Sequence, residues 1–503
     1  MTMNTMGAVS VDTSDIQGIV RFGFGPLTEA AFLLLNIRDA ANARTWLKSA
    51  PITTSEKLSN PPITALQVAF THAGLQAMGA GEDLLSGFSP EFLSGMTGDE
   101  SRSRRLGDIG ANSPRLWKWG SPGNVPHMLV MVYAQPGHLD PWLRTVQTAN
   151  WECAFETLAF LTTSDLQGTE PFGFNDGVSQ PAIDWSRERT PKENELTFGN
   201  VLSLGEFLLG YPNEYGKYTS RPLLNADARS SSLLPLAEDQ PAKRDFGRNG
   251  TFLVFRQLQQ DVRGFWRFLD KQAHSDSRAR QELAEAMVGR CMDGTPRVPL
   301  DLQPIAGIDS KMADKNQFTF DSDKDGVRCP LGAHIRRANP RNADLPASNG
   351  IFSRLLHILG FGNSKYRDDV IASTRFHRML RRGREYGPRL TAEEAIADGL
   401  DAGEHGIHFI CIVSNILRQF EFVQNSWLMG TKFDALTDQS DPLLGNREAI
   451  AGCPATNAFC LPQETGTRVR ITDLPQFVVV RGGAYFFLPS LSALRYLAAI
   501  GED

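Results

Sequence analysis

The sequence is poor in cysteine, and its cysteines form no pattern. Only six occur in 503 residues, with no CxxC pair and no CxxCH motif. Disulfide frameworks and cysteine-based zinc sites both need closely matched cysteines, so this spacing argues against both. It favours a reducing compartment, in which thiols stay free.

A long apolar run and an excess of positive charge are also missing. No run of 18 apolar residues occurs, so no segment suits a membrane-spanning helix. The formal net charge is −6, which argues against nucleic acid as the main partner because phosphate binding needs a basic surface. Residues 1–18 contain no arginine, no lysine and no apolar core, so we expect no export signal and a cytoplasmic location.

What the chain does have is an ordinary globular composition, with 41% hydrophobic and 21% charged residues. Apolar runs typical of strands alternate with amphipathic segments in both halves of the sequence. This pattern predicts an α+β fold with mostly antiparallel sheets flanked by helices. The length allows two domains. We place the linker in the polar, proline-containing segment 212–248, which gives domains at residues 1–230 and 231–503.

The pattern also predicts individual elements. The expected strands are residues 31–37, 65–71, 128–133, 155–160, 250–258 and 407–413. The expected helices begin near residues 40, 72, 142, 260, 414 and 491. Near the C-terminus, residues 477–480 and 484–488 are expected to form a hairpin around Gly482 and Gly483, because paired glycines favour a tight turn.

The most informative run is residues 329–341, CPLGAHIRRANPR, in which His334 stands among arginines. A single imidazole surrounded by cations is a poor zinc site, because zinc takes three or four protein ligands. It suits haem, whose iron needs one protein ligand and whose two propionates can pair with arginines. A structural histidine in a basic loop is the alternative. His377, which lies outside this run, is expected to have a surface or loop role.

A second motif presents a carboxylate. Gly173 and Gly177 bracket Asp176 in GFNDG, which predicts a tight turn with the acidic side chain exposed. On its own, this motif is also compatible with an aspartate that only caps a turn. Three more motifs follow it in sequence order: GAHIRRANPR at 332–341, RMLRRGREYG at 378–387 and RQFEFVQ at 418–424. In this combination and order, the chain resembles the dye-decolorizing peroxidase family, and its length resembles the longer C/D-type branch.

The resemblance implies a tandem pair of ferredoxin-like α+β domains with one haem b per chain. It implies an enzyme that reduces hydrogen peroxide and oxidises bulky aromatic donors, such as dyes and phenolics, through a high-valent oxo-iron state. By this resemblance, His334 matches the proximal ligand of the iron, Asp176 the distal acid–base residue and Arg381 the distal arginine. A haem carrier or sensor on the same fold, and a haem-free binding protein, are the alternatives.

The remaining site residues also come from the resemblance. Arg341 and Arg336 match partners of the haem propionates. Ile407 and Phe409 match the apolar border of the peroxide pocket, and their spacing of two on a strand would put both on one face. Asp441 resembles the carboxylate that receives the other N–H of the proximal histidine.

Overall fold

The computed structural model describes residues 11–189, 199–226, 232–302, 315–341, 374–399, 403–434, 436–448 and 456–501. Its central feature is one long antiparallel sheet with the strand order β10-β12-β9-β15-β2-β3-β1-β4, and β11 also pairs with β12. The strands are β1 (Glu29–Ile37), β2 (Thr64–Phe70), β3 (Met128–Ala134), β4 (Phe155–Thr162), β9 (Thr251–Gln260), β10 (Leu380–Arg381), β11 (Arg384–Tyr386), β12 (Gly406–Val413) and β15 (Val478–Leu488). The predicted α+β class with antiparallel strands is confirmed.

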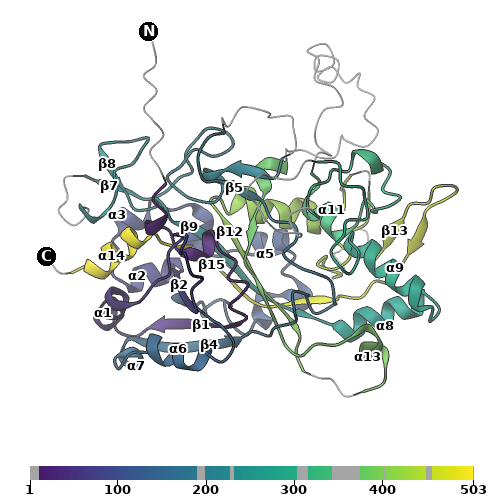
Figure 1. Cartoon of the computed structure of the whole chain (residues 1–503), viewed down its shortest axis with the longest axis horizontal. Helices are drawn as coiled ribbons and strands as arrows, with labels where there is room; N and C mark the ends of the chain where they lie inside the picture. Colours follow the sequence, from purple (N-terminus) through teal and green to yellow (C-terminus); the bar gives the residue numbers. More distant parts are fainter. Residues whose placement is uncertain are drawn as a thin grey trace, which may run out of the picture.

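Helices lie around both ends of this sheet (Figure 1). One group surrounds the N-terminal strands: α1 (Ala40–Ser49), α2 (His72–Ala77), α6 (Leu139–Val146), α7 (Trp151–Ala154) and α14 (Leu491–Ala499). The other lies near the C-terminal strands: α8 (Val262–Gln272), α9 (Ser277–Val288), α11 (His334–Ala338) and α13 (Ala392–Ile396). The helix expected after residue 414 is present as two π-helical segments, η9 (Leu417–Glu421) and η10 (Val423–Met429).

Helix α8 illustrates how the sequence sets these elements. The carboxylate of Asp261 accepts a hydrogen bond from the backbone N–H of Gly264 and so caps the first turn. Val262, Phe265 and Leu269 then recur at helical spacing, and all three are buried. This face packs into an aromatic cluster that borders the candidate site. Among the helices described, none is long and apolar enough to cross a membrane.

The hairpin predicted at residues 477–488 is wrong. Residues Val478–Leu488 form one continuous strand, β15, with a shift in register between Val480 and Gly482. The glycines serve close packing instead of a turn, because a Cβ on Gly482 would lie 2.4 Å from the ring of Trp119. Glycine inside a strand commonly marks such a bulge or close approach.

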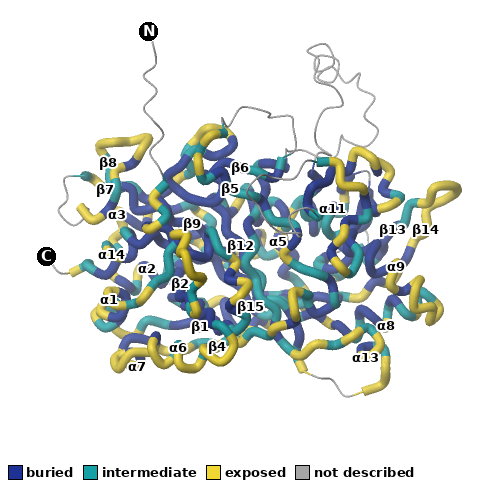
Figure 2. Tube along the Cα trace, in the orientation of Figure 1, coloured by how far each residue is buried: buried dark blue, intermediate teal, exposed yellow. Residues whose placement is uncertain are grey.

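The core fills both faces of the sheet. Every residue of β3 is buried, including neighbours whose side chains point to opposite faces. Figure 2 shows buried and intermediate positions along the central strands, in dark blue and teal, and exposed positions mainly in loops and outer helices. Because both faces are covered, the predicted strands read as continuous apolar runs instead of alternating ones.

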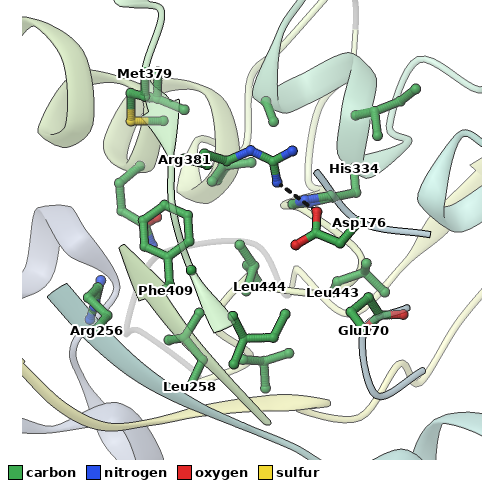
Figure 3. Close-up of a pocket in the computed structure, with 18 of the residues that line it drawn as sticks. Glu170, Asp176, Arg256, Leu258, His334, Met379, Arg381, Phe409, Leu443 and Leu444 are labelled. Carbon is green, nitrogen blue, oxygen red and sulfur yellow. Dashed lines mark hydrogen bonds and ion pairs between the residues drawn. The ribbon is translucent and has the colours of Figure 1, made fainter. Parts of the chain in front are cut away.

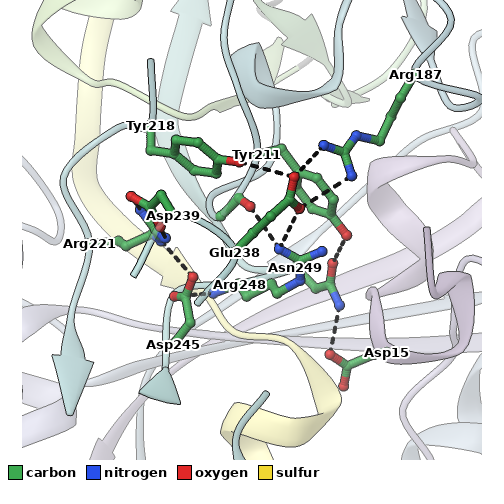
Figure 4. A network of polar contacts seen from close by, with 11 residues as sticks. Asp15, Arg187, Tyr211, Tyr218, Arg221, Glu238, Asp239, Asp245, Arg248 and Asn249 are labelled. Atoms are coloured by element: carbon green, nitrogen blue, oxygen red, sulfur yellow. Dashed lines mark hydrogen bonds and ion pairs between the residues drawn. The ribbon is translucent and has the colours of Figure 1, made fainter. Parts of the chain in front are cut away.

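The segment predicted as a linker is packed against the rest of the protein. Strands β7 (Leu223–Asn225) and β8 (Lys243–Asp245) pair with each other, and the guanidinium of Arg221 donates to Asp245 at 2.6 Å (Figure 4). Asn249, just after the segment, donates to Asp15 at 2.8 Å. The described residues of this segment, 212–226 and 232–248, therefore belong to the folded structure, and the division into domains at residue 230 stays a prediction.

We expect Asp245→Ala to destabilise the protein by about 3 kcal/mol, because removal of one partner leaves Arg221 with an incompletely compensated buried charge. Asp245 is fully buried and also accepts from the backbone N–H of Arg248. The free energy of unfolding in urea measures the effect. Arg278→Ala, which breaks the exposed pair with Glu282, is the control and should change stability by less than about 0.5 kcal/mol. Equal losses in the two variants would contradict a structural role for the buried pair.

Candidate active site

The candidate site is a cavity of about 260 Å³ next to the C-terminal half of the sheet. Five of the predicted site residues line it: Asp176, His334, Arg381, Ile407 and Phe409. Much of the remaining wall is apolar, with leucines from β9 and from residues 443–444 (Figure 3). Segments far apart in the sequence thus meet around one space.

His334 is the first residue of α11, and its ring is fixed by Asp441. The imidazole Nδ1 lies 2.9 Å from Oδ2 of Asp441, and the other carboxylate oxygen accepts from the backbone N–H groups of Leu443 and Leu444. Burial lowers the pKa of His334, but the charge and hydrogen bond of Asp441 outweigh it, and the net pKa is raised. Burial raises the pKa of Asp441, but the charge and hydrogen bond of His334, together with the N–H of Leu444 and the charge of Arg337, outweigh burial, and the net pKa is lowered. An ionised Asp441 takes the N–H at Nδ1, which leaves Nε2 with a lone pair.

Asp176 and Arg381 form an ion pair in the wall of the same cavity. Nη1 of Arg381 donates to Oδ1 of Asp176 at 3.2 Å. Gly173 and Gly177 both have positive φ, at 100° and 73°, so the turn that presents Asp176 depends on glycine at these positions. Gln180 joins this turn to β10, because its amide exchanges two hydrogen bonds with the backbone of Arg381. In Figure 3, the side chains of Asp176, Arg381 and His334 point toward one another.

Ile407 and Phe409 lie on one face of β12, as their spacing predicted. Both line the cavity. His408 between them points to the opposite face, where its ring stacks on Tyr386 and its Nε2 lies 3.0 Å from the carbonyl of Thr162. Two apolar side chains therefore border the Asp176–Arg381 pair, and the intervening histidine is part of the core.

Known proteins resemble this chain along nearly its whole length. It is 29% identical over 516 residues to "Dye-decolorizing peroxidase msp1" of Mycetinis scorodonius, covering 98% of this chain and 89% of that protein. It is 30% identical over 521 residues to "Peroxidase 2" of the same organism, covering 97% and 88%. The chain belongs to the dye-decolorizing peroxidase family. No family model matches the sequence.

A solved structure supports the same assignment to the dye-decolorizing peroxidases. A dye-decolorizing peroxidase in complex with 2,6-dimethoxyphenol has a TM-score of 0.68 and 25% identity, covering 97% of this chain and 100% of that one. The predicted α+β fold with an antiparallel sheet is thus that of known members. The full-length match also agrees with the predicted longer branch of the family.

Two arginines predicted as propionate partners lie outside the wall of the peroxidase cavity. Nη1 of Arg341 donates to the carbonyls of Asn316 and Phe318, and its guanidinium lies 3.6 Å from the ring centroid of Phe318. Arg336 donates to the carbonyls of Cys329 and Asp323. Neither is among the residues that line the cavity, because backbone carbonyls hold both guanidiniums. Their contact with a propionate stays a prediction.

Two other arginines, Arg290 and Arg378, line the peroxidase cavity and were not predicted as site residues. Both are buried, and burial lowers the pKa of each to about 10. Arg290 donates to the carbonyls of Gly294 and Lys315 and to Ser179, and within the described ranges no carboxylate pairs with it. Arg378 stands in a recognised motif and could have been proposed, but nothing in the local sequence marks Arg290.

His377 also lines the cavity, and its predicted surface or loop role is wrong. It is 5% exposed, and its ring stacks on Phe422 at 3.8 Å. Its Nδ1 lies 2.5 Å from the carbonyl of Arg418, and burial lowers its pKa to about 4. Considering only the described residues, its Nε2 has no hydrogen-bond partner. A neutral imidazole therefore presents an acceptor in the wall.

These residues fit the haem that the family implies. Haem needs one axial base, and the imidazole of His334 is held with one nitrogen unprotonated. It needs apolar walls for the ring, and the leucines and Phe409 supply them. Its two carboxylates need cations, and Arg290 and Arg378 are buried cations in the wall. A zinc site does not fit, because the described residues contain no group of three or more metal-ligating side chains.

Proposed function

We propose that this peroxidase binds one haem b per chain through His334, reduces hydrogen peroxide and oxidises bulky aromatic donors. One observation carries the proposal: the Asp176–Arg381 ion pair and the His334–Asp441 pair share one cavity. The donor class is supported by the names of the relatives, which decolorize dyes, and by the phenol bound to one of them.

Haem, when bound, supplies the iron that coordinates peroxide and accepts its oxidising equivalents. Asp176, in its ionised form, would accept a proton from one oxygen of hydrogen peroxide and return it to the other oxygen, which would leave as water. Arg381 keeps its positive charge 3.2 Å from that carboxylate. It stabilises the negative charge that builds on the departing oxygen.

His334, in the wall of the same cavity, would hold the haem iron. Asp441 is fully buried and receives the N–H at Nδ1 of His334. This contact fixes the tautomer and the plane of the ring, and it makes Nε2 a stronger electron donor. Ile407 and Phe409 add apolar surface to the cavity that holds Asp176, and we expect them to admit peroxide more readily than a bulky dye.

Two features of the site favour this function over the two alternatives. A haem carrier or sensor has no need of a carboxylate paired with a guanidinium in the cavity. A haem-free binding protein has no need of an unprotonated imidazole nitrogen beside buried cations.

We expect the purified protein to bind about one equivalent of haem with an intense Soret band, as a haem-free protein would not. Addition of hydrogen peroxide should change this spectrum within seconds. An anthraquinone dye or a phenol should then restore the first spectrum and be oxidised. A Soret band that peroxide leaves unchanged would instead indicate the carrier or sensor.

A further inference from the structure

Glu170 is a second carboxylate in the wall of this cavity, and the reaction outlined above does not use it. It lies six residues before Asp176 in the same turn, and both residues line the cavity. The bridge between Thr169 and Asn175 closes the turn. Figure 3 shows Glu170 and Asp176 on the same side of the space.

The carboxyl group of Glu170 is surrounded by donors. Its Oε1 accepts from the backbone N–H of Phe174 at 3.0 Å. Its Oε2 accepts from the backbone N–H of Phe172 at 3.0 Å and from Nε2 of Gln260 at 2.7 Å. These contacts fix the turn that carries Asp176. They also fix the carboxyl group against the amide of Gln260, which comes from β9.

Gln260 supplies an observation that is independent of the acidic residues. Its side chain lines the cavity and is 5% exposed, yet its Oε1 has no partner among the described residues. A buried acceptor without a donor is costly. A protonated Glu170 offers the missing O–H donor, because a carboxylic acid and an amide can exchange two hydrogen bonds: N–H to the acid carbonyl and O–H to the amide oxygen.

The charges around Glu170 favour the same protonated form. The titratable groups that act on it are Asp176 in its own turn and Glu385 on β11, both negative. In the described ranges, Glu170 has no ion pair with a cation. Withdrawal from water raises the pKa of Glu170, and the charge of Asp176 adds to this shift. The N–H donors of Gln260, Phe174 and Phe172 lower the pKa by less, so the net pKa is about 7. The pKa of Glu385 is also raised to about 7, chiefly by burial.

We propose that Glu170 is a positioning residue that stays protonated while the peroxidase reacts with peroxide, and that its ionisation slows this reaction. The inference rests on the proposed role of Asp176. A protonated Glu170 leaves Asp176 as the single negative charge beside Arg381, which is the form that accepts a proton from peroxide. When Glu170 loses its proton to solvent, a second negative charge opposes ionised Asp176, and Oε1 of Gln260 loses its O–H donor, while the N–H of Gln260 still donates to the carboxylate.

The test is the rate constant for the reaction of haem-loaded protein with hydrogen peroxide as a function of pH. In the wild type, we expect a fall of roughly tenfold between about pH 6 and pH 8. Glu170→Gln keeps an amide opposite Gln260 and cannot ionise. It should remove this fall and stay within about threefold of wild type at pH 6. Glu282→Gln, which changes an exposed carboxyl outside the cavity wall, is the control and should keep the fall. A flat wild-type profile, or a fall that persists in Glu170→Gln, overturns the proposal.

A second measurement needs no turnover. The infrared difference spectrum between wild type and Glu170→Gln should contain the carbonyl band of a protonated carboxyl at pH 6, and the band should disappear by about pH 8. If the carbonyl band is absent at pH 6 while the peroxide reaction still depends on Asp176, the inference about Glu170 is wrong but the proposed function stands. If Asp176→Asn reacts with peroxide as fast as wild type, the proposed function fails instead, and a band at pH 6 still establishes the proton on Glu170.

Discussion

His334→Ala should give a folded protein that has lost its affinity for haem. The imidazole is the only axial base that we assign, and the substitution also leaves the buried carboxylate of Asp441 without its partner at 2.9 Å. We expect haem affinity to fall by more than about 100-fold, since even loss of the partner of an axial ligand costs about 10- to 100-fold. Titration of the haem-free protein with haem, followed by the Soret band, measures the affinity.

Two further variants test whether the loss of haem affinity is due specifically to the imidazole of His334. His138→Ala changes an exposed histidine and should bind haem as wild type does. Asp441→Asn keeps the imidazole but weakens its hydrogen bond, so it should show an intermediate loss of about 10- to 100-fold. Wild-type affinity in His334→Ala would contradict the assignment of the axial ligand, and it would direct attention to His377, which also lines the cavity.

Arg381→Leu should retain haem but react with peroxide about 1,000-fold more slowly. Loss of a charged donor that stabilises a developing negative charge costs about 100- to 1,000-fold, and Arg381 is the cation paired with Asp176. Asp176→Asn keeps the shape of the side chain but cannot accept the proton, and we expect a loss of about 100-fold. Stopped-flow measurement of the peroxide step, on protein with an intact Soret band, gives both rates.

The control for this pair is Arg389→Leu, which removes an exposed arginine nearby in the sequence and should leave the peroxide rate unchanged. The double variant of Asp176 and Arg381 should lose less than the product of the two single losses, because the residues act as one unit. If Arg381→Leu slows only the oxidation of the dye and not the peroxide step, its assigned role is wrong.

Most of the fold could be predicted because its long strands are apolar runs. The segments that became β1, β2, β3, β4, β9 and β12 were all recognised. The prediction failed at β15, where Gly482 has the signature of a turn but makes room for Trp119, a contact set by packing with a distant segment. It also missed the short strands between residues 182 and 245, which have too few residues to show a period.

The site residues also fall into those that the local sequence could predict and those that it could not. Asp176, His334 and Arg381 stand in motifs whose residue types and order carry the information. The sequence around Arg290 and Gln260 gives no sign of a functional site, because each residue becomes part of the cavity wall only after distant segments have packed. Glu170 lies beside a recognised motif, but its partner on β9 is 90 residues away.

The position of β15 constrains how the protein can be made. This strand is near the end of the chain, yet it lies between β9 and β2 and joins the two halves of the sheet, with Phe487 opposite Phe70. Until the ribosome has released residues 478–488, β2 and β9 each keep an open edge that can pair with other chains. The sheet therefore closes only after residues 478–488 have been synthesised, and a chain truncated before this strand should be prone to aggregation.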